Sequence, residues 1–486
     1  MAMPSSPLRI SCSPSPSPVA IAPGAAHLKR FMEWWHADPA FRAELESGRY
    51  DGVARRGLAV DAEAVRVLWD SALAPQLDAV LQDVSAPIDD PLVADGIGLL
   101  RLWRADAEHQ AIHHPTPADA RFATWRARQI ARMRTALGHV RLNAISHMLF
   151  ACELTEGCSV GCWFCGVDAQ KMGEHFRATP DNVLLWEGVL DTFAESFGAE
   201  ASRAGLLFWA TDPLDNPDYE IFCERFRALF GAPPPTTTAV ALRDPERTRR
   251  LIRAIATPER PSHLRFSVLS VRMLEQLHAA FTAEELGAVH LIPHLKGSSY
   301  ELSLSGRARK QPQRARTAAA VEADGASQGG DSLRTGQTIA CVSGFLLNMV
   351  RRSVQLITPC DADDRWPLGY WILDERSFAS AGELRDAIET MIATHMPPRF
   401  PAERVARFRR DLQHVPIEDG FAVVSAYGCE QFTGDAVMTF VGAAVARGVL
   451  TAEAIVAISG AGEAAREAIE TLFARGVLDE EPEVRA

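Results

Sequence analysis

Three closely spaced cysteines constrain this chain more than any other feature of its sequence. Cys158, Cys162 and Cys165 follow C-x3-C-x2-C spacing on a stretch with three glycines, which let a backbone wrap closely around a ligand. The apolar residues 143–151 before them predict a buried strand, so the cysteines lie on the loop that follows it. Three thiolates on one loop can hold three irons of a [4Fe-4S] cube and leave the fourth iron open, whereas ferredoxins close the cube with a fourth cysteine.

Zinc is the alternative occupant of such a group of cysteines. A structural zinc ion needs four ligands, which usually come from two C-x2-C pairs. This chain has one such pair, Cys162 and Cys165, and Cys152 or a more distant cysteine would have to complete the set. The spacing therefore favours an open iron–sulfur cluster, with zinc as the alternative.

The composition limits the cellular compartments and the kinds of partner that we expect for this protein. The 50 basic and 62 acidic residues give a net charge of −12, which disfavours a nucleic-acid partner whose affinity depends on neutralising phosphates. No apolar run reaches the roughly 18 residues of a membrane-spanning helix, and the Pro/Ser-rich start is unlike a secretory signal. Nine cysteines, three of them clustered, then predict reduced thiols and metal binding in the cytoplasm.

Changes of pattern along the chain predict six segments. The first cannot bury apolar area, and alternating apolar strands and helices begin at residue 143. The expected segments are a disordered tail (1–26), an N-terminal helical domain (27–142), a strand–helix domain (143–305), a flexible insertion (306–336), a small antiparallel sheet with helices (337–420) and a winged-helix-like C-terminal unit (421–486).

The helical domain shows clear start signals and one unusual run of charge. Asp38 and Pro39 predict the cap and first turn of a second helix, and a third helix is expected after Asp61. Its tryptophans are expected in the core, although this unit is also similar to Nif11-type segments of peptide leaders. The arginine-rich helix expected within 116–141 predicts a solvated face, with attraction of an acidic peptide as the alternative.

Five apolar strands separated by helices are expected between residues 143 and 293. They are predicted at 143–151, 205–210, 236–242, 264–269 and 289–293, with helices at 245–256 and 271–281 among the connections. Repeated βα units specify a parallel sheet with helices outside it, and a partial barrel is one closed form. Ligand groups in such barrels lie on loops at the carboxyl ends of the strands.

Two further cysteines lie on strands expected after the insertion. Strands are predicted at 338–349, 354–360 and 366–373, and Cys341 and Cys360 lie on the first two. A cysteine at a strand end is most often a small buried hydrophobe. The other interpretations are a ligand of an auxiliary iron–sulfur cluster and a thiol that donates a hydrogen atom.

The cysteine spacing, with Phe164 just before the last cysteine, resembles the radical S-adenosylmethionine (SAM) superfamily. The resemblance implies a partial (β/α)6 barrel in an α/β chain, here with an N-terminal helical unit and a C-terminal α+β extension. It also implies that SAM binds the open iron and that Phe164 lies near the adenine. Thr211 and Asp212 stand where the family has a Gly-Gly-Glu motif for the SAM amino group, and Ser267 or Ser270 can reach the ribose.

With the paired cysteine strands and the 211–217 loop, the chain looks like radical SAM epimerases that mature ribosomally made (RiPP) peptides. This resemblance implies that L-residues of a precursor peptide become D-residues after loss of the Cα hydrogen. It implies Cys360, or else Cys341, as the hydrogen donor, and a flavodoxin or ferredoxin as the reductant. Residues 421–486 resemble a winged helix that clamps a leader peptide, or serve only as a packing element. The alternatives are a thioether-forming maturase and, from another class, a zinc-stabilised binding protein.

Overall fold

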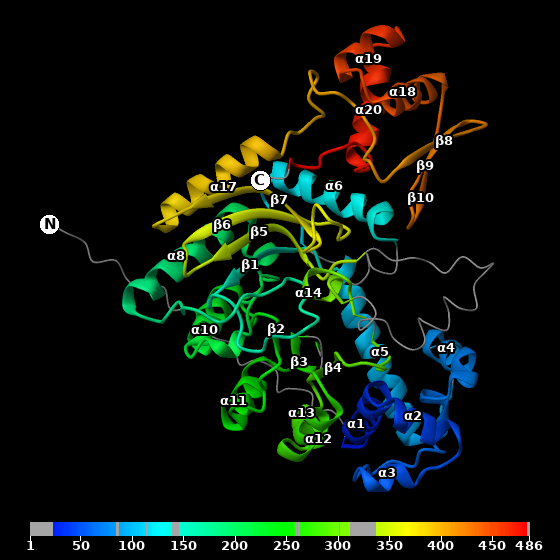
Figure 1. Ribbon diagram of the computed structural model, residues 1–486, viewed down its shortest axis with the longest axis vertical. Helices are drawn as coiled ribbons and strands as arrows, with labels where there is room; N and C mark the ends of the chain where they lie inside the picture. The colour runs from blue at the N-terminus through cyan, green and yellow to red at the C-terminus, as the bar shows by residue number, and fades with distance from the viewer. Residues whose placement is uncertain are drawn as a thin grey trace, which may run out of the picture.

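The computed structural model describes residues 23–83, 87–112, 115–138, 145–257, 260, 263–300, 302–311 and 337–483. These residues form a mixed α/β protein with three sheets (Figure 1). Nearly all of the predicted tail and most of the predicted insertion lie outside the described residues. The described start of the insertion contains the short helix α14 (Gly306–Arg309).

The N-terminal helices pack together at one end of the molecule (Figure 1). They are α1 (Pro23–Ala37), α2 (Pro39–Glu46), α3 (Asp51–Arg55), α4 (Ala74–Gln82) and α5 (Pro91–Ile112). The Asp38 side chain caps α2 as predicted, because it accepts from the Ala40 amide at 3.0 Å. The helix expected after Asp61 is only a short 3-10 turn (Arg66–Leu68). Trp34 and Trp69 are buried, which confirms that these two tryptophans are core residues.

The solvated face predicted for the arginines of α6 (Ala120–Ala136) is wrong for three of them, whereas Arg121 and Arg134 are exposed as expected. Arg126, Arg128 and Arg132 are buried because each guanidinium meets an acceptor from a distant part of the chain. Arg126 donates to the His147 carbonyl, and Arg128 forms an ion pair with Glu480 at 2.9 Å. Arg132 donates to the Pro359 carbonyl at 2.6 Å.

Parallel strands alternate with helices in the central part of the chain. The strands are β1 (Met148–Glu153), β2 (Thr236–Thr238), β3 (Leu264–Val268) and β4 (His290–Pro293). The helices are α8 (Pro180–Phe197), α9 (Ala199–Ser202), α10 (Tyr219–Phe230), α11 (Pro245–Ile255), α12 (Val271–Ala280) and α13 (Ala283–Leu286). Strands β2, β3 and β4 pair in parallel in chain order, as repeated βα units predict.

The predicted strand at 205–210 is reduced to a single bridge beside β1. Leu206 exchanges backbone hydrogen bonds with Phe150 (3.0 Å) and Cys152 (2.8 Å). Farther along the segment, the Ala210 amide donates to the Glu153 carboxylate instead of to a strand (2.9 Å). This side-chain bond ends the pairing and turns the chain toward residues 211 and 212.

Strands β5 (Val342–Asn348), β6 (Ser353–Pro359) and β7 (Tyr370–Ser377) pair antiparallel, as predicted. They do not form a sheet of their own, because β5 also pairs in parallel with β1 in the order β1-β5-β6-β7. Helix α17 (Ala381–His395) lies along this sheet beside α8 (Figure 1). The residues on either side of the insertion are therefore joined through one sheet.

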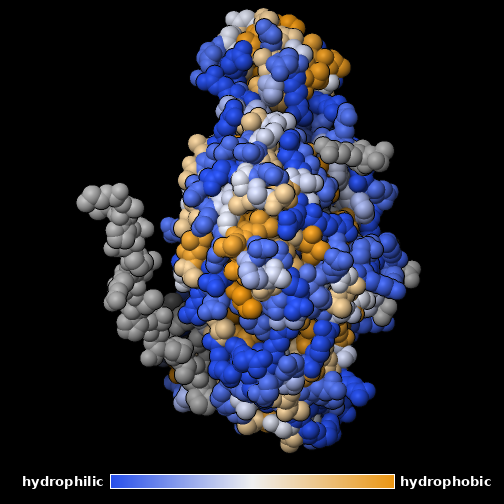
Figure 2. Space-filling view, turned by 90° about the vertical axis from the view of Figure 1, so that its left-hand side faces the viewer, coloured by the Kyte–Doolittle hydropathy of each residue, from blue (hydrophilic) through white to orange (hydrophobic). Residues whose placement is uncertain are grey.

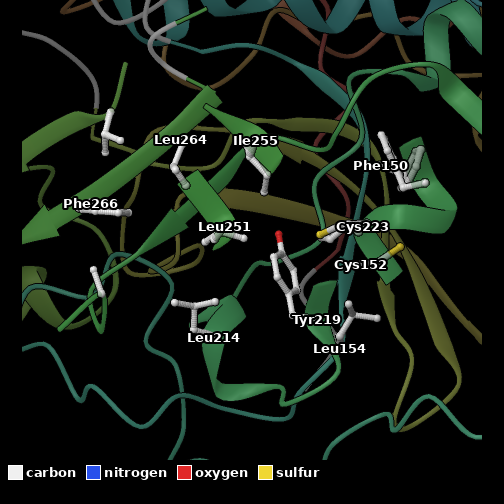
Figure 3. Packing of buried hydrophobic residues seen from close by; sticks show 14 of the residues in the cluster. Phe150, Cys152, Leu154, Leu214, Tyr219, Cys223, Leu251, Ile255, Leu264 and Phe266 are labelled. Atoms are coloured by element: carbon white, nitrogen blue, oxygen red, sulfur yellow. The ribbon is translucent and has the colours of Figure 1, made fainter. Parts of the chain in front are cut away.

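The central core lies between the parallel strands, among them β1 and β3, and the helices α10 and α11. Figure 3 shows buried side chains from both layers turned toward one another. They include Phe150, Leu154, Tyr219, Cys223, Leu251, Ile255, Leu264 and Phe266. Cys223 is thus a core residue. Burial of such large side chains stabilises the fold by about 1.5–3 kcal/mol each.

The C-terminal unit has its own sheet and core at the far end of the molecule (Figure 1). Its strands are β8 (Gln413–Ile417), β9 (Gly420–Val424) and β10 (Cys429–Thr433), and they pair antiparallel in the order β10-β9-β8. Three helices follow, α18 (Ala436–Arg447), α19 (Ala452–Ser459) and α20 (Glu463–Ala474). A small sheet with three helices is consistent with the winged-helix-like unit expected for residues 421–486, although β8 begins before residue 421.

Apolar residues on the face in Figure 2 are scattered in patches among hydrophilic ones. None of the helices in the described part of the chain is both long enough and apolar enough to cross a membrane.

Candidate functional site

One cavity of about 480 Å3 brings together most of the residues singled out in the sequence. It lies among the cysteine loop (residues 157–171), the carboxyl ends of the parallel strands and the segment that leads into β5. We call it the central cavity. The predicted site residues that line it are Cys158, Cys162, Phe164, Cys165, Thr211, Asp212, Ser267 and Cys341.

Backbone contacts hold the cysteine loop in place. The Cys158 amide donates to the Gln170 carbonyl at 2.9 Å, which closes the loop on itself. Gly157 has φ +65°, and a Cβ there would overlap the Lys171 carbonyl, so this position requires glycine. From α14, the Arg307 side chain donates to the Cys162 carbonyl (3.0 Å), and the Arg307 backbone amide donates to the Cys165 carbonyl (2.8 Å). The loop is therefore positioned by segments about 140 residues apart in the sequence.

The donor set of the cysteine loop fits an iron–sulfur cube. Burial, followed by the neighbouring Cys158 and Cys165, raises the pKa of Cys162 to about 12. In a cube each cysteine binds a different iron, and the fourth iron is left for another ligand. Within the described ranges, no three His, Cys, Asp or Glu side chains are grouped as ligands of a single ion.

Asp212 is buried and fastens the end of one βα loop to the next strand. Its carboxylate accepts from the Leu214 amide (3.0 Å), the Ala239 amide (2.7 Å) and the Thr238 hydroxyl (2.8 Å). Burial raises the pKa of Asp212 to about 6 despite these bonds. A carboxylate has about four acceptor positions, so one remains for a ligand donor in the central cavity. Asp212 can therefore both link its loop to β2 and the residue after it and bind a ligand.

The two candidate serines are separated by the structure. Ser267 lies in β3 and lines the central cavity. Ser270 instead caps α12, where its hydroxyl accepts from the Met273 amide at 3.1 Å. The structure therefore brings Ser267, and not Ser270, to the other candidate residues.

The two candidate hydrogen-donor cysteines line different cavities. Cys341 precedes β5 and lines the central cavity, and burial raises the pKa of its thiol, which therefore stays protonated. Cys360 follows β6, as predicted, but lines a second cavity of about 280 Å3 beside the C-terminal unit. Arg132, Trp371 and Tyr427 also line this second cavity. The resemblance implied Cys360 as the first choice of hydrogen donor, but it is Cys341 that lines the same cavity as the loop cysteines.

Two residues of the central cavity were missed by the sequence reasoning. His294 directly follows β4, at the kind of strand end where ligand groups are expected in parallel α/β folds. Its position after an apolar strand was the signal that could have identified it. Ser303 lies on an irregular segment, and no local pattern marks it.

The fold and the site thus define a mixed α/β protein in which three loop cysteines and a fourth thiol line one cavity. The chain belongs to the family of a protein of Sinorhizobium fredii (strain NBRC 101917 / NGR234) described as "Uncharacterized protein y4wI". The two are 36% identical over 466 residues, which cover 94% of this chain and 87% of the relative. No family model matches the chain, and no solved structure matches it.

Proposed function

We propose that this protein is a radical SAM enzyme that converts L-residues of a ribosomally made precursor peptide into D-residues. The observation that supports this most directly is the content of the central cavity. Three loop cysteines, Phe164, the polar residues Thr211 and Asp212 and a protonated thiol share this one space. The parallel strands β2 to β4, with the Leu206 bridge beside β1, support a partial barrel around it.

Each residue has a definite part in the proposed reaction. Cys158, Cys162 and Cys165 would hold the cluster, Asp212 and Thr211 would accept from the SAM amino group, and Ser267 would contact the ribose. When bound, the cluster and SAM supply a 5′-deoxyadenosyl radical, which takes the Cα hydrogen and leaves as 5′-deoxyadenosine.

Cys341 would return the hydrogen atom. Its S–H bond breaks as a new Cα–H bond forms on the opposite face of the peptide carbon. One electron from a flavodoxin- or ferredoxin-type donor and one proton from water then restore the thiol. Ile145 and Trp209 line the same cavity and would keep water from the peptide radical.

The C-terminal unit would hold the leader of the precursor peptide. Strand β10 is an edge of its sheet, because in the described part of the chain it pairs with β9 alone. An edge strand presents free backbone groups to which an extended peptide can add. A reaction that depends on reduced thiols places the protein in the cytoplasm.

Two variants that make the same cysteine-to-serine change, one in each cavity, test this proposal. Cys341→Ser should still produce 5′-deoxyadenosine from SAM but no D-residues, because a serine O–H bond is too strong to donate its hydrogen atom. Cys360→Ser should epimerise normally, since Cys360 lies in the second cavity. The protein is reconstituted anaerobically and incubated with SAM, reductant and a precursor peptide encoded near its gene.

Chiral analysis of the hydrolysed peptide and its mass distinguish the outcomes. In deuterated water each D-residue should gain one deuteron. A product that has lost two hydrogens would instead identify a cross-linking enzyme. D-residues formed at the parent rate by Cys341→Ser would refute the assigned donor, and absence of SAM cleavage by the parent protein would refute the whole proposal.

A further inference from the structure

Asp215 and Asn216 belong to a short turn that packs against the cysteine loop. Asp215 ends the 3-10 helix Pro213–Asp215, and Asn216 follows it. The Asn216 side-chain amide donates to the carbonyls of Leu154 (2.6 Å) and Phe176 (2.9 Å), which lie a few residues before and after the cysteine loop. This turn therefore fixes the two ends of the loop relative to each other.

The Asp215 carboxylate contacts the cysteine loop itself, at Ser159. One carboxylate oxygen accepts from the Ser159 amide at 2.8 Å, and the other accepts from the Ser159 hydroxyl at 2.5 Å. The side chain of Asp215 is 0% exposed, so its charge is held away from water. Ser159 directly follows Cys158, and its amide nitrogen is only a few covalent bonds from the Cys158 sulfur. A buried negative charge is therefore held close to one of the loop thiols.

Arg243, on the loop between β2 and α11, is the cation that pairs with Asp215. Its guanidinium forms an ion pair with the Asp215 carboxylate at 2.8 Å and donates to the Ser159 hydroxyl at 2.6 Å. The Arg243 side chain is 51% exposed, so water and salt screen its charge. The Asp215 charge is screened much less, because the surroundings of a buried group have a lower dielectric constant. We therefore expect the negative charge of this pair to dominate at the cysteine loop.

We propose that Asp215 and Arg243 are positioning residues that hold the cysteine loop in its cluster-binding shape and set the reduction potential of the bound cluster. This inference rests on the proposed function, because it requires the iron–sulfur cluster. A negative charge beside a cluster disfavours the reduced state, which carries one more electron, and so lowers the potential. Asp215 would keep the cluster strongly reducing, as electron transfer into SAM requires, and Arg243 would partly offset this effect.

The reduction potential of the reconstituted cluster, measured by redox titration with electron paramagnetic resonance at pH 8, tests this inference. Asp215→Asn removes the negative charge at nearly constant size, so the potential should rise. Arg243→Gln removes the offsetting cation, so the potential should fall, and by less at high salt. Arg243→Lys keeps the charge and should restore the parent potential. Asp218→Asn, whose partner Arg177 lies beyond the cysteine loop, is the matched control and should keep the parent potential.

Hydrogen exchange of the cluster-free protein tests the positioning role separately. In Asp215→Ala the Ser159 amide loses its acceptor and should exchange about ten-fold faster than in the parent. Unchanged exchange at Ser159 would overturn the positioning role. Potentials that stay at the parent value, or that shift in the same direction in Asp215→Asn and Arg243→Gln, would overturn the electrostatic role and leave the proposed function standing. Failure of the parent protein to take up an iron–sulfur cluster would overturn both the inference and the proposed function.

Discussion

Glu33 is a buried acidic residue that links the N-terminal helices to the central part of the chain through an ion pair. Its side chain on α1 is 9% exposed and forms ion pairs with Lys29 and, on α12, with His278 at 2.8 Å. Burial by itself raises the pKa of Glu33, but Lys29 and His278 outweigh it and lower the pKa from 4.5 to about 2. The carboxylate is therefore more stable in the folded protein than in the unfolded chain.

The size of this effect follows from the shifted pKa. A fall from 4.5 to about 2, at about 1.4 kcal/mol per pKa unit, corresponds to about 3 kcal/mol of stability. Because the folded pKa is depressed, this stabilisation is complete above about pH 4.5 and is lost as the pH falls through about 2. Glu33→Gln removes the charge and leaves Lys29 buried without its partner, so we expect a loss of about 3 kcal/mol at pH 7.

Urea denaturation at pH 7 and pH 3 measures this difference. At pH 3 the gap between the parent and Glu33→Gln should shrink to about half, because Glu33 is then mostly protonated in the unfolded chain and still mostly charged in the folded protein, so proton uptake favours unfolding of the parent. Glu46→Gln on α2 is the matched control; Glu46 is exposed, so the change should stay within about 0.5 kcal/mol. A Glu33→Gln variant as stable as the parent at pH 7, or a gap that does not change with pH, would refute the reasoning.

Three further predictions concern the central cavity and its support. Replacing all three loop cysteines with alanine should abolish iron binding and 5′-deoxyadenosine formation while the circular dichroism spectrum stays that of the parent; SAM cleavage by this variant would contradict the proposed cluster. Ser267→Ala should weaken S-adenosylhomocysteine binding, whereas Ser270→Ala should leave binding unchanged and cost about 1 kcal/mol of stability as a lost helix cap, measured by calorimetry and urea denaturation. Gly205→Ala should lower the free energy of unfolding by about 1–3 kcal/mol, because the new Cβ overlaps the Phe150 ring; an unchanged urea midpoint would show that the core adapts.

Local features of the chain were predictable because they depend on neighbouring residues. The cysteine loop was identified from spacing within eight residues, and the cap of α2 from Asp38 and Pro39 alone. The parallel order of β2, β3 and β4 follows from the alternation of strands and helices, since consecutive βα units pack side by side. The strand at 205–210 was overpredicted because the Glu153 side chain, and not a neighbouring strand, takes the Ala210 amide.

The choice between the two candidate thiols depended on strand pairing. Cys341 and Cys360 look alike in the sequence, since each lies at a strand end in an apolar run. The pairing of β5 with β1 brings Cys341 beside Met148, whose amide donates to the Cys341 carbonyl at 2.6 Å, and so to the central cavity. Cys360, one strand farther from β1, lines the second cavity. Pairing between segments about 190 residues apart leaves no local pattern.

The arginines of α6 are a second case in which contacts between distant segments could not be predicted from the local sequence. Their spacing predicts a solvated face, because a run of like charge is usually stable only in water. Arg126, Arg128 and Arg132 are nevertheless buried, because acceptors at His147, Glu480 and Pro359 satisfy them. His294 and Ser303 likewise come to line the central cavity only because β4 and the segment after it lie beside the cysteine loop. The sequence alone determined the spacing of the loop cysteines and the strand–helix order. The tertiary structure decided which side chains share a cavity, because contacts between distant segments determine burial.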